Sequence, residues 1–380
     1  IQFKALVPFA QWNQMAITRG DFDGNGTKDS LILAIKSGSF NLTDSFQFIN
    51  PVISIHTIND KSNIEIDAYS NNALQRLHLK GIANTFSDGL SLSWEPSYFI
   101  LNQKKWDIDK GGELSLRKSN TYAKNLRFSQ GIQEFIFRNG IKNAIQLELK
   151  NVILGDLTKL FFSYPSLEGI TNGKIQFNDV LENLVVQSDL KIDQFSFNND
   201  LVGYTNLNAS YFKATGKVPF SFSIPNTDYN LSADGTYNLM DSINPLDATL
   251  YMHNSKFSLV QQFIGSVLTN LEGKADGAIH FGGRIEHPVL KGYAAIKNAS
   301  FVVDYTKVKY AIDTATIKFT DEGIDFGTIQ VKDKLNRTAL FKGKIYNQGF
   351  KHLDYDMEMS SAKIELLNMT PIDNIYFYLT

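Results

Sequence analysis

Short segments between residues 64 and 320 alternate apolar and polar side chains with a period of two, as in Ile64-Glu65-Ile66-Asp67. Successive side chains of a β-strand point to opposite faces, so each such segment is typical of a half-buried strand. Glycine-containing steps of the kind found in hairpin turns separate these segments. The steps are Asp88-Gly89, Asn139-Gly140, Asn172-Gly173, Asp234-Gly235 and Glu322-Gly323. The pattern predicts a mostly-β, antiparallel fold.

One part of the sequence is repeated. Residues 167–177 recur at residues 271–281, and the register of the two copies, 271 minus 167, is 104 residues. The register continues without a gap, because Ile192 falls on Ile296 and Phe197 on Phe301. A fixed period indicates one structural unit used at least twice. Repeated β units build long surfaces more readily than a single catalytic pocket.

Composition excludes several classes of function. The 380 residues carry a net charge of −2, which gives no electrostatic footprint for a nucleic-acid partner. There is no cysteine, so disulfides, zinc–thiolate sites and thiol nucleophiles are excluded. No run of 18 apolar residues is present to span a bilayer as a helix.

Both ends of the sequence predict an internal piece of a longer chain. The first residues, Ile1-Gln2-Phe3-Lys4, include no initiator Met and no signal peptide, and residues 375–380 have the pattern of a strand. We therefore expect any membrane association to come from segments outside this sequence.

Two segments have helical periodicity, and each precedes one copy of the repeat. In residues 257–271 apolar side chains recur at spacings of three and four, with Ser255 as N-cap, and a shorter segment covers residues 154–162. Each helix could plug a groove or lie on a membrane surface. Packing across the open end of its own β unit is favoured, because Lys256 is the only basic residue between Ser255 and Leu271 and interfacial helices carry several.

These observations predict three modules. A strand-only module covers residues 1–152, and two helix-plus-sheet repeats cover residues 153–254 and 255–380.

A calcium loop is one interpretation of residues 21–29. Oxygen ligands stand at positions one, three, five and nine, namely Asp21, Asp23, Asn25 and Asp29, and Gly26 stands at position six. Position twelve is Ile32 instead of the glutamate of an EF-hand, and a polar turn between strands explains the same residues. Any such calcium would be structural, and no cofactor is required.

No catalytic constellation is present, so we expect a protein that is not an enzyme. The six histidines are scattered, no Gly-x-Ser-x-Gly elbow occurs, and residues 169–174 are one residue too short between their glycines for a phosphate-binding loop. Asp325 and Asp333 are two acidic residues that could be interpreted as a catalytic pair, but nothing in the sequence places them together. Solvent-exposed positions at strand edges explain both residues.

The second copy of the repeat resembles the C-terminal region of the TamB family, the translocation and assembly module proteins of Gram-negative envelopes. The resemblance lies in residues 271–301, where glycine stands at 273, 277, 282 and 292, and continues through residues 305–310, 333–350 and 373–378. It is specific over about residues 257–380 and weaker back to about residue 75.

The resemblance implies the elongated, U-shaped β-groove of AsmA-like and bridge-like lipid-transfer proteins, a twisted sheet folded like a taco. It implies a periplasmic segment that conducts phospholipid between inner and outer membranes with an outer-membrane β-barrel partner of the TamA/BamA type. Acyl chains would lie on the apolar face of the strands. The residues expected to line that face are Ile64, Ile66, Leu77, Leu79, Leu90, Leu92, Ile175, Phe177, Ile279, Phe281, Ile296, Phe301, Ile317 and Phe319.

Three alternatives stay open on the residues alone. A closed sandwich or barrel gives the same alternation as an open groove. A scaffold could hold outer-membrane strands on its edge strands by β-augmentation while barrels assemble. An adhesin or polysaccharide-binding repeat would present aromatic platforms, but the only tryptophans are Trp12, Trp94 and Trp106.

Overall fold

The computed structural model describes residues 1–13, 15–43, 46–141, 143–160, 165–256, 258, 268–285, 287–347 and 353–368. These residues form two compact units. The N-terminal unit comprises residues 1–199 and 211–214, and the C-terminal unit comprises residues 200–210 and 215–380. The three modules expected from the sequence stay a prediction.

The N-terminal unit contains strands β1 to β17 and helix α1. Their bounds are β1 (Gln2–Trp12), β2 (Met15–Gly26), β3 (Ser30–Lys36), β4 (Ser39–Thr43), β5 (Phe46–Ile58), β6 (Lys61–Tyr69), β7 (Leu74–Phe86), β8 (Gly89–Trp94), β9 (Ser97–Leu101), β10 (Lys104–Ile108), β11 (Glu113–Arg117), β12 (Tyr122–Lys124), β13 (Leu126–Gln130), β14 (Gln133–Asn139), β15 (Ile145–Ile153), α1 (Leu154–Thr158), β16 (Leu167–Asn178) and β17 (Val185–Phe197).

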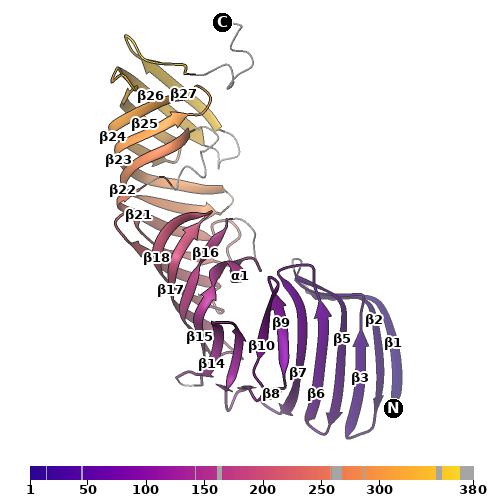
Figure 1. The fold of residues 1–380 in the computed structure, drawn as a ribbon. Helices are drawn as coiled ribbons and strands as arrows, with labels where there is room; N and C mark the ends of the chain where they lie inside the picture. The colour runs from indigo at the N-terminus through magenta and orange to yellow at the C-terminus, as the bar shows by residue number, and fades with distance from the viewer. Residues whose placement is uncertain are drawn as a thin grey trace. The chain divides into compact units, whose positions relative to one another are not determined.

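Every strand pairing described in this unit is antiparallel, and most pairs follow chain order. Strands β1, β2, β3, β5, β6 and β7 lie side by side (Figure 1). Strand β7 then pairs with β8 at one end and with β9 at the other. Strands β8, β11 and β12 form one branch, and strands β9, β10 and β13 to β17 form the other.

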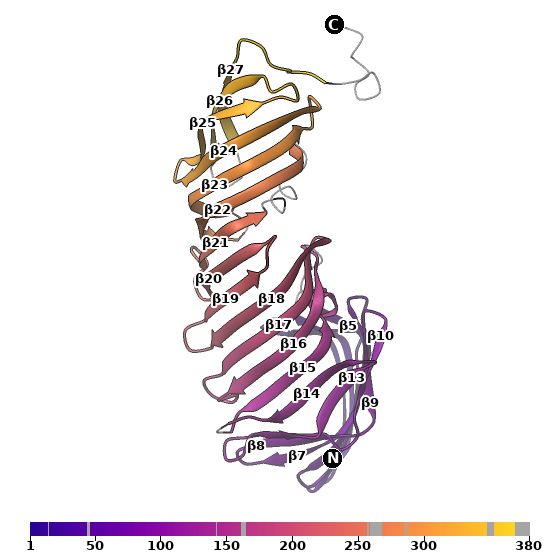
Figure 2. The same ribbon diagram turned by 60° about the vertical axis from the view of Figure 1, so that its left-hand side comes forward.

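The C-terminal unit contains the remaining strands, apart from the last two residues of β18, which are assigned to the N-terminal unit. Their bounds are β18 (Asp200–Phe212), β19 (Lys217–Pro225), β20 (Asn230–Asn238), β21 (Leu246–Lys256), β22 (Leu268–Arg284), β23 (His287–Val303), β24 (Val308–Thr320), β25 (Gly323–Lys332), β26 (Thr338–Asn347) and β27 (Leu353–Ser360). From β19 to β27 each strand pairs antiparallel with the next one in the chain, and Figure 2 shows this succession. The prediction of a mostly-β antiparallel groove is confirmed.

Helix α1 is shorter than the periodicity predicts, and most of the longer helical segment lies outside the described residues. Helix α1 has five residues where nine were expected, and residues 161–162 of that segment lie outside the described residues. At the longer segment, the proposed N-cap Ser255 lies in β21, and Leu268 and Leu271 lie in β22. At Ser255, pairing with Ala275 in the sheet takes the place of the expected N-cap. Residues 257 and 259–267 lie outside the described residues, and no described helix is long and apolar enough to cross a membrane.

The sequence repeat is also a repeat of local structure. Strands β15, β16 and β17 correspond to β21, β22 and β23, and equivalent residues pair: Gly173 pairs with Leu190, and Gly277 pairs with Ala294. A bulge bends the first strand of each set at an asparagine with positive φ, Asn151 or Asn254. The two units therefore contain the same bent three-stranded element.

The same side-chain bond supports the bulge in both copies. The amide of Asn151 donates to Asn172 Oδ1 at 2.9 Å, and the amide of Asn254 donates to Asp276 Oδ1 at 2.8 Å. The two acceptors occupy equivalent positions of the repeat. Each bond satisfies a backbone donor that the bulge removes from the ladder.

Two glycines expected in turns lie inside strands. Gly173 is in β16 and Gly235 is in β20, so the prediction of hairpin turns at Asn172-Gly173 and Asp234-Gly235 was wrong. A Cβ at Gly173 would lie 2.2 Å from the carbonyl oxygen of Asp189, and one at Gly277 would lie 2.2 Å from that of Tyr293. The neighbouring strand approaches so closely that only glycine fits.

We expect Gly277→Ala to lower the free energy of unfolding of the C-terminal unit by about 2 kcal/mol, because the methyl group forces the strands apart. Urea unfolding followed by circular dichroism measures the change. The control is Gly282→Ala in the same strand, where the nearest atom to the new Cβ is a side-chain nitrogen of His280 at 3.4 Å. Equal midpoints for the two variants would contradict the close-approach argument.

Candidate functional site: the apolar face of the sheets

The six expected lining residues in β6, β7 and β8 lie on one face of the sheet. Ile66 pairs with Leu79, Ile64 pairs with Gly81, and Leu92 pairs with Ala83. Leu77, Leu79, Gly81 and Ala83 alternate along β7, and directly paired residues of antiparallel strands share a face. Leu90 follows the same alternation in β8. The register therefore places all six side chains on the same face of the sheet.

The same apolar face continues to Ile175 and Phe177 in β16. Ile175 pairs with Leu147, which pairs with Phe137 in β14. Between β7 and β14 the face is covered by aromatic rings. Their ring contacts join Phe99 to Trp106 and Phe128, Trp106 to Phe135, and Phe128 to Phe137.

This aromatic cluster was missed by the sequence interpretation. Trp106 is 0% exposed, and its ring stacks on Phe99 at 5.8 Å and on Phe135 at 4.9 Å between centroids. The residues come from strands of five to seven residues, too short for a clear periodic signal. The apolar face is filled by its own side chains at this point.

In the C-terminal unit the six expected lining residues also share one face. Ile279 pairs with Gly292, Gly292 with Phe319, and Phe281 with Leu290. Ile296 and Ile317 follow the same alternation, and Ile317 pairs with Ala294. Phe301, beyond a second bulge at Asn298, packs against the same buried cluster as Ile317.

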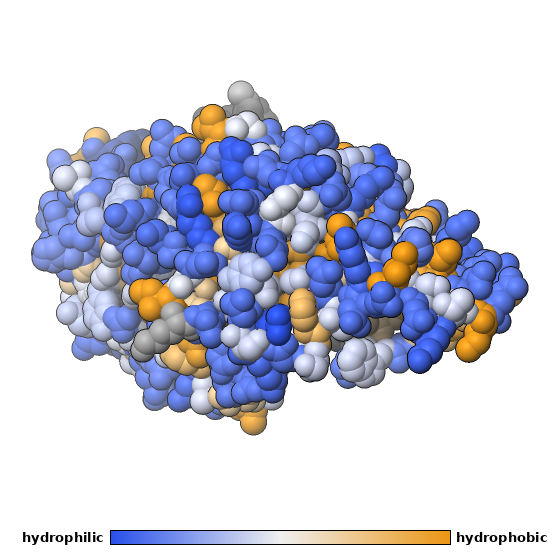
Figure 3. All heavy atoms as spheres, turned by 90° about the horizontal axis from the view of Figure 1, so that it is seen from below, coloured by the Kyte–Doolittle hydropathy of each residue, from blue (hydrophilic) through white to orange (hydrophobic). Residues whose placement is uncertain are grey.

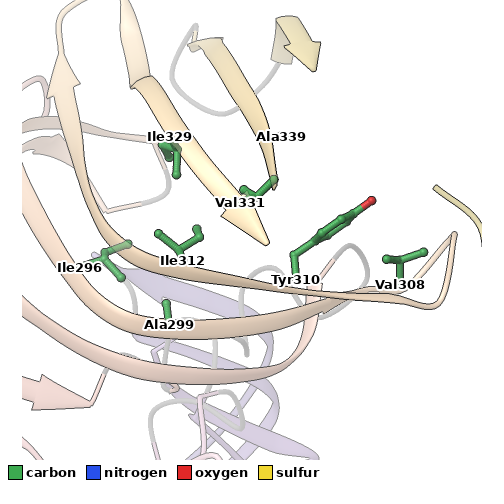
Figure 4. Close-up of a cluster of buried hydrophobic side chains, with 8 residues drawn as sticks. All are labelled: Ile296, Ala299, Val308, Tyr310, Ile312, Ile329, Val331 and Ala339. Carbon is green, nitrogen blue, oxygen red and sulfur yellow. The ribbon is translucent and has the colours of Figure 1, made fainter. Parts of the chain in front are cut away.

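That buried cluster lies inside the curve of β23 and β24 (Figure 4). It consists of Ile296, Ala299, Val308, Tyr310, Ile312, Ile329, Val331 and Ala339, and we call it the C-terminal cluster. Figure 4 shows side chains of β25 and β26 facing those of β23 and β24 across the curve. The concave side of these strands is therefore the apolar side.

The exposed fractions of the expected lining residues distinguish an open apolar face from the core of a closed sandwich or barrel. Ile279 and Ile296 are buried, at 9% and 8% exposed, and Leu90 is 38% exposed. The other eleven are half-buried. In a closed sandwich or barrel such residues would all be buried, so most of this apolar face keeps partial access to solvent.

The opposite face is polar and charged. Lys80 pairs with Glu65 at 2.8 Å in the N-terminal unit, and Lys297 pairs with Asp276 at 3.0 Å in the C-terminal unit. Such exposed ion pairs add little stability, and they identify this face as the one in contact with water. In the view of Figure 3 hydrophilic residues predominate and hydrophobic atoms form separate patches.

The segment that follows β27 crosses the edge of the C-terminal cluster without joining the sheet. We call residues 361–368 the strap. The amide of Glu365 donates to Asp333 Oδ2 at 3.1 Å, the Tyr310 hydroxyl donates to the carbonyl of Glu365 at 2.7 Å, and the amide of Asn368 donates to the carbonyl of Thr306 at 2.8 Å. The strap therefore connects the start of β24 with the turn between β25 and β26.

Asp333 holds both that turn and the strap, so its interpretation as a solvated strand-edge residue was wrong. Its side chain is fully buried, and it accepts hydrogen bonds from the amides of Leu335 and Arg337 as well as from Arg337 Nε at 2.6 Å. Burial acts to raise the pKa of this carboxyl. The hydrogen bonds from Glu365, Arg337 and Leu335 outweigh burial and lower the pKa to about 2 from an ordinary 3.8.

A depressed pKa means that the folded protein favours the charged form, so Asp333 stabilises the strap above its ordinary pKa of 3.8 and loses this effect as the pH falls towards about 2. We expect Asp333→Asn to reduce the protection factors of the strap amides by about tenfold between about pH 8 and about pH 5. The difference from the wild type should shrink below pH 3.8 and vanish only below the folded pKa of about 2. Hydrogen exchange measures it, with the exposed Asp321→Asn as control. A difference that persists unchanged at the lowest pH would contradict the charge argument.

The calcium loop expected at residues 21–29 is a strand for most of its length. Asp21, Asp23 and Asn25 lie in β2, which pairs with β1 and β3, so alternate side chains stand about 6.7 Å apart and do not converge on one point. Within the described ranges no group of three or more His, Asp or Glu residues could hold a metal ion. A bound calcium stays a prediction on which nothing below rests.

Comparison of the chain with protein-family models, curated proteins and solved structures finds no match. The resemblance to the TamB family therefore rests on the residues named above.

Proposed function

We propose that this protein is a segment of a TamB-like, bridge-like lipid-transfer protein whose apolar face holds the acyl chains of phospholipids. The observation that carries the proposal is the shared face. The register puts every expected lining residue except Phe301 on one side of the sheet in its unit, Phe301 packs against the same cluster as Ile317, and most of these residues are half-buried.

Acyl chains suit this face because hydrophobic binding depends on the apolar area that is buried and needs no directional contacts such as hydrogen bonds. Each buried methylene contributes about 0.8 kcal/mol, so a chain regains on the apolar face part of the free energy that it loses on leaving a bilayer, in proportion to the area it buries there. The head group would stay at the wetter rim of the groove. Movement would be diffusion along the face, with no covalent step and no cofactor.

The location and partner in this proposal come from the resemblance. The protein would work in the periplasm, between the two membranes of a Gram-negative envelope. It would end at an outer-membrane β-barrel protein of the TamA/BamA type. Anchoring in a membrane would come from segments outside this sequence.

Phospholipid capture tests the proposal. The purified chain would be incubated with vesicles of phosphatidylethanolamine and phosphatidylglycerol and separated from them by flotation, and the lipid left with the protein would be quantified. We expect phospholipid to remain with the protein in solution. Protein that floats with no lipid in the soluble fraction would contradict the proposal.

One observation favours the scaffold as a second candidate. Among the described residues β1 pairs only with β2, so one edge of its eleven-residue backbone is open, and Leu6 and Phe9 on it are exposed. An open edge strand with exposed apolar side chains can add a strand from another protein. Replacing Leu6 by Lys should weaken strand addition and leave lipid capture unchanged, so the two candidates respond to different substitutions.

A further inference from the structure

The strap places one apolar and one acidic residue side by side at the edge of the C-terminal cluster. Ile364 packs against the cluster, while Leu366 and Leu367 beside it are exposed. The Glu365 carboxylate lies 2.8 Å from the Lys334 ammonium. The strap thus places the apolar side chain of Ile364 and the carboxylate of Glu365 next to each other against the sheet.

Lys334 stands in the turn between β25 and β26, at the rim of the apolar side. It also approaches Asn368 Oδ1 at 3.4 Å, so both of its described contacts are with the strap. The Lys334 side chain is exposed even with the strap in place, and Glu365 also accepts a hydrogen bond from Tyr310 of the cluster through its carbonyl. A phosphate at the same position would pair with Lys334 as the carboxylate does.

The strap does not satisfy its own polar groups fully. Glu365 is mostly buried, yet its Oε2 atom has no hydrogen-bond partner among the described residues. The strap adds no strand to the sheet, and its connections are single hydrogen bonds, one ion pair and the packing of Ile364. A ligand that satisfied the same cation and the same apolar surface could displace it.

We propose that the strap occupies an anionic-phospholipid subsite of this groove, with Ile364 in the position of an acyl chain and Glu365 in the position of the phosphate. This inference rests on the proposed function and deepens it, because it names the lipid class and the place of one subsite. Lipid binds there only when the strap leaves, so the strap regulates the C-terminal end of the apolar face.

The test is photo-labelling of the full chain. The probe is phosphatidylglycerol with a diazirine near the end of one acyl chain, delivered from phosphatidylcholine vesicles, and labelled peptides are mapped by mass spectrometry. Ile364→Ser should raise labelling of the cluster residues in β24 and β25 by about tenfold, the effect of losing one partly buried apolar side chain from the strap. The matched control is Leu366→Ser, which alters an exposed strap residue and should label as the wild type does.

A second pair of variants tests the head-group position in the Ile364→Ser background. Adding Lys334→Gln should remove the preference for phosphatidylglycerol over a phosphatidylcholine probe with the same diazirine. Adding Lys309→Gln should retain it, because Lys309 lies on the polar face next to Glu272. Equal labelling by the two probes before either change would overturn the anionic assignment.

The outcomes separate this inference from the proposed function. Cluster labelling in the wild type as strong as in Ile364→Ser would show that the strap does not compete, and would overturn the inference. Label on the apolar face of β6 and β7 but none at the cluster in any variant would also overturn it, while the proposed function would stand. No label on either apolar face would overturn both.

Discussion

Replacing Phe281 by Asp should reduce the phospholipid captured by the protein by at least about tenfold while the sheet stays folded. Phe281 lies on the apolar face of β22, between Ala248 and Leu290 of the neighbouring strands, and is half-buried. A carboxylate there remains hydrated because the face is partly open. Acyl chains would have to displace that water, so lipid binding should fall much more than stability. Flotation with lipid quantification measures the change.

The matched control is Tyr251→Asp. Tyr251 pairs with Ala278, which is adjacent to Ile279 in β22, so it points to the opposite, polar face. The two variants introduce the same charge in place of an aromatic ring in neighbouring strands. Phe281→Asp with wild-type lipid content, or Tyr251→Asp with an equal loss, would contradict the assignment of the apolar face.

Trp106→Ala should lower the free energy of unfolding of the N-terminal unit by about 4 kcal/mol, the largest effect on stability that we expect in this chain. Trp106 is fully buried between Phe99 and Phe135, and alanine would leave a cavity among rings that come from separate short strands. Urea unfolding followed by circular dichroism measures the loss.

Trp12→Ala is the control for Trp106→Ala. Trp12 is 72% exposed at the end of β1, so its removal should change stability by no more than about 0.5 kcal/mol. Equal effects of the two variants would contradict a packed aromatic core at Trp106.

The faces of the strands could be predicted from the sequence because the choice of face is local. Ile64 and Ile66, or Ile279 and Phe281, are separated by one polar residue, and the period of two allows only one burial pattern for each pair. The repeat could also be predicted from the sequence, since Gly173 and Gly277 occupy equivalent positions and pair with the equivalent residues Leu190 and Ala294.

What could not be predicted depends on partners distant in sequence. Ser255 has the position of an N-cap in the sequence, but it pairs with Ala275 in a sheet, beyond a bulge at Asn254. Asp21 and Asp23 have the spacing of a calcium loop, but pairing of β2 with β1 and β3 holds this segment as an extended strand. The strap had no local signal, because Glu365 meets Asp333 from 32 residues away.

Native mass spectrometry with lipid extraction, on protein purified from a bacterial host without detergent, tests the central claim most directly. An apolar face that holds acyl chains predicts phospholipid bound to the purified chain, in amounts that fall with Phe281→Asp and are unchanged by Tyr251→Asp. A stable, lipid-free monomer would contradict the claim, and would leave the open edge of β1 as the feature through which this protein acts.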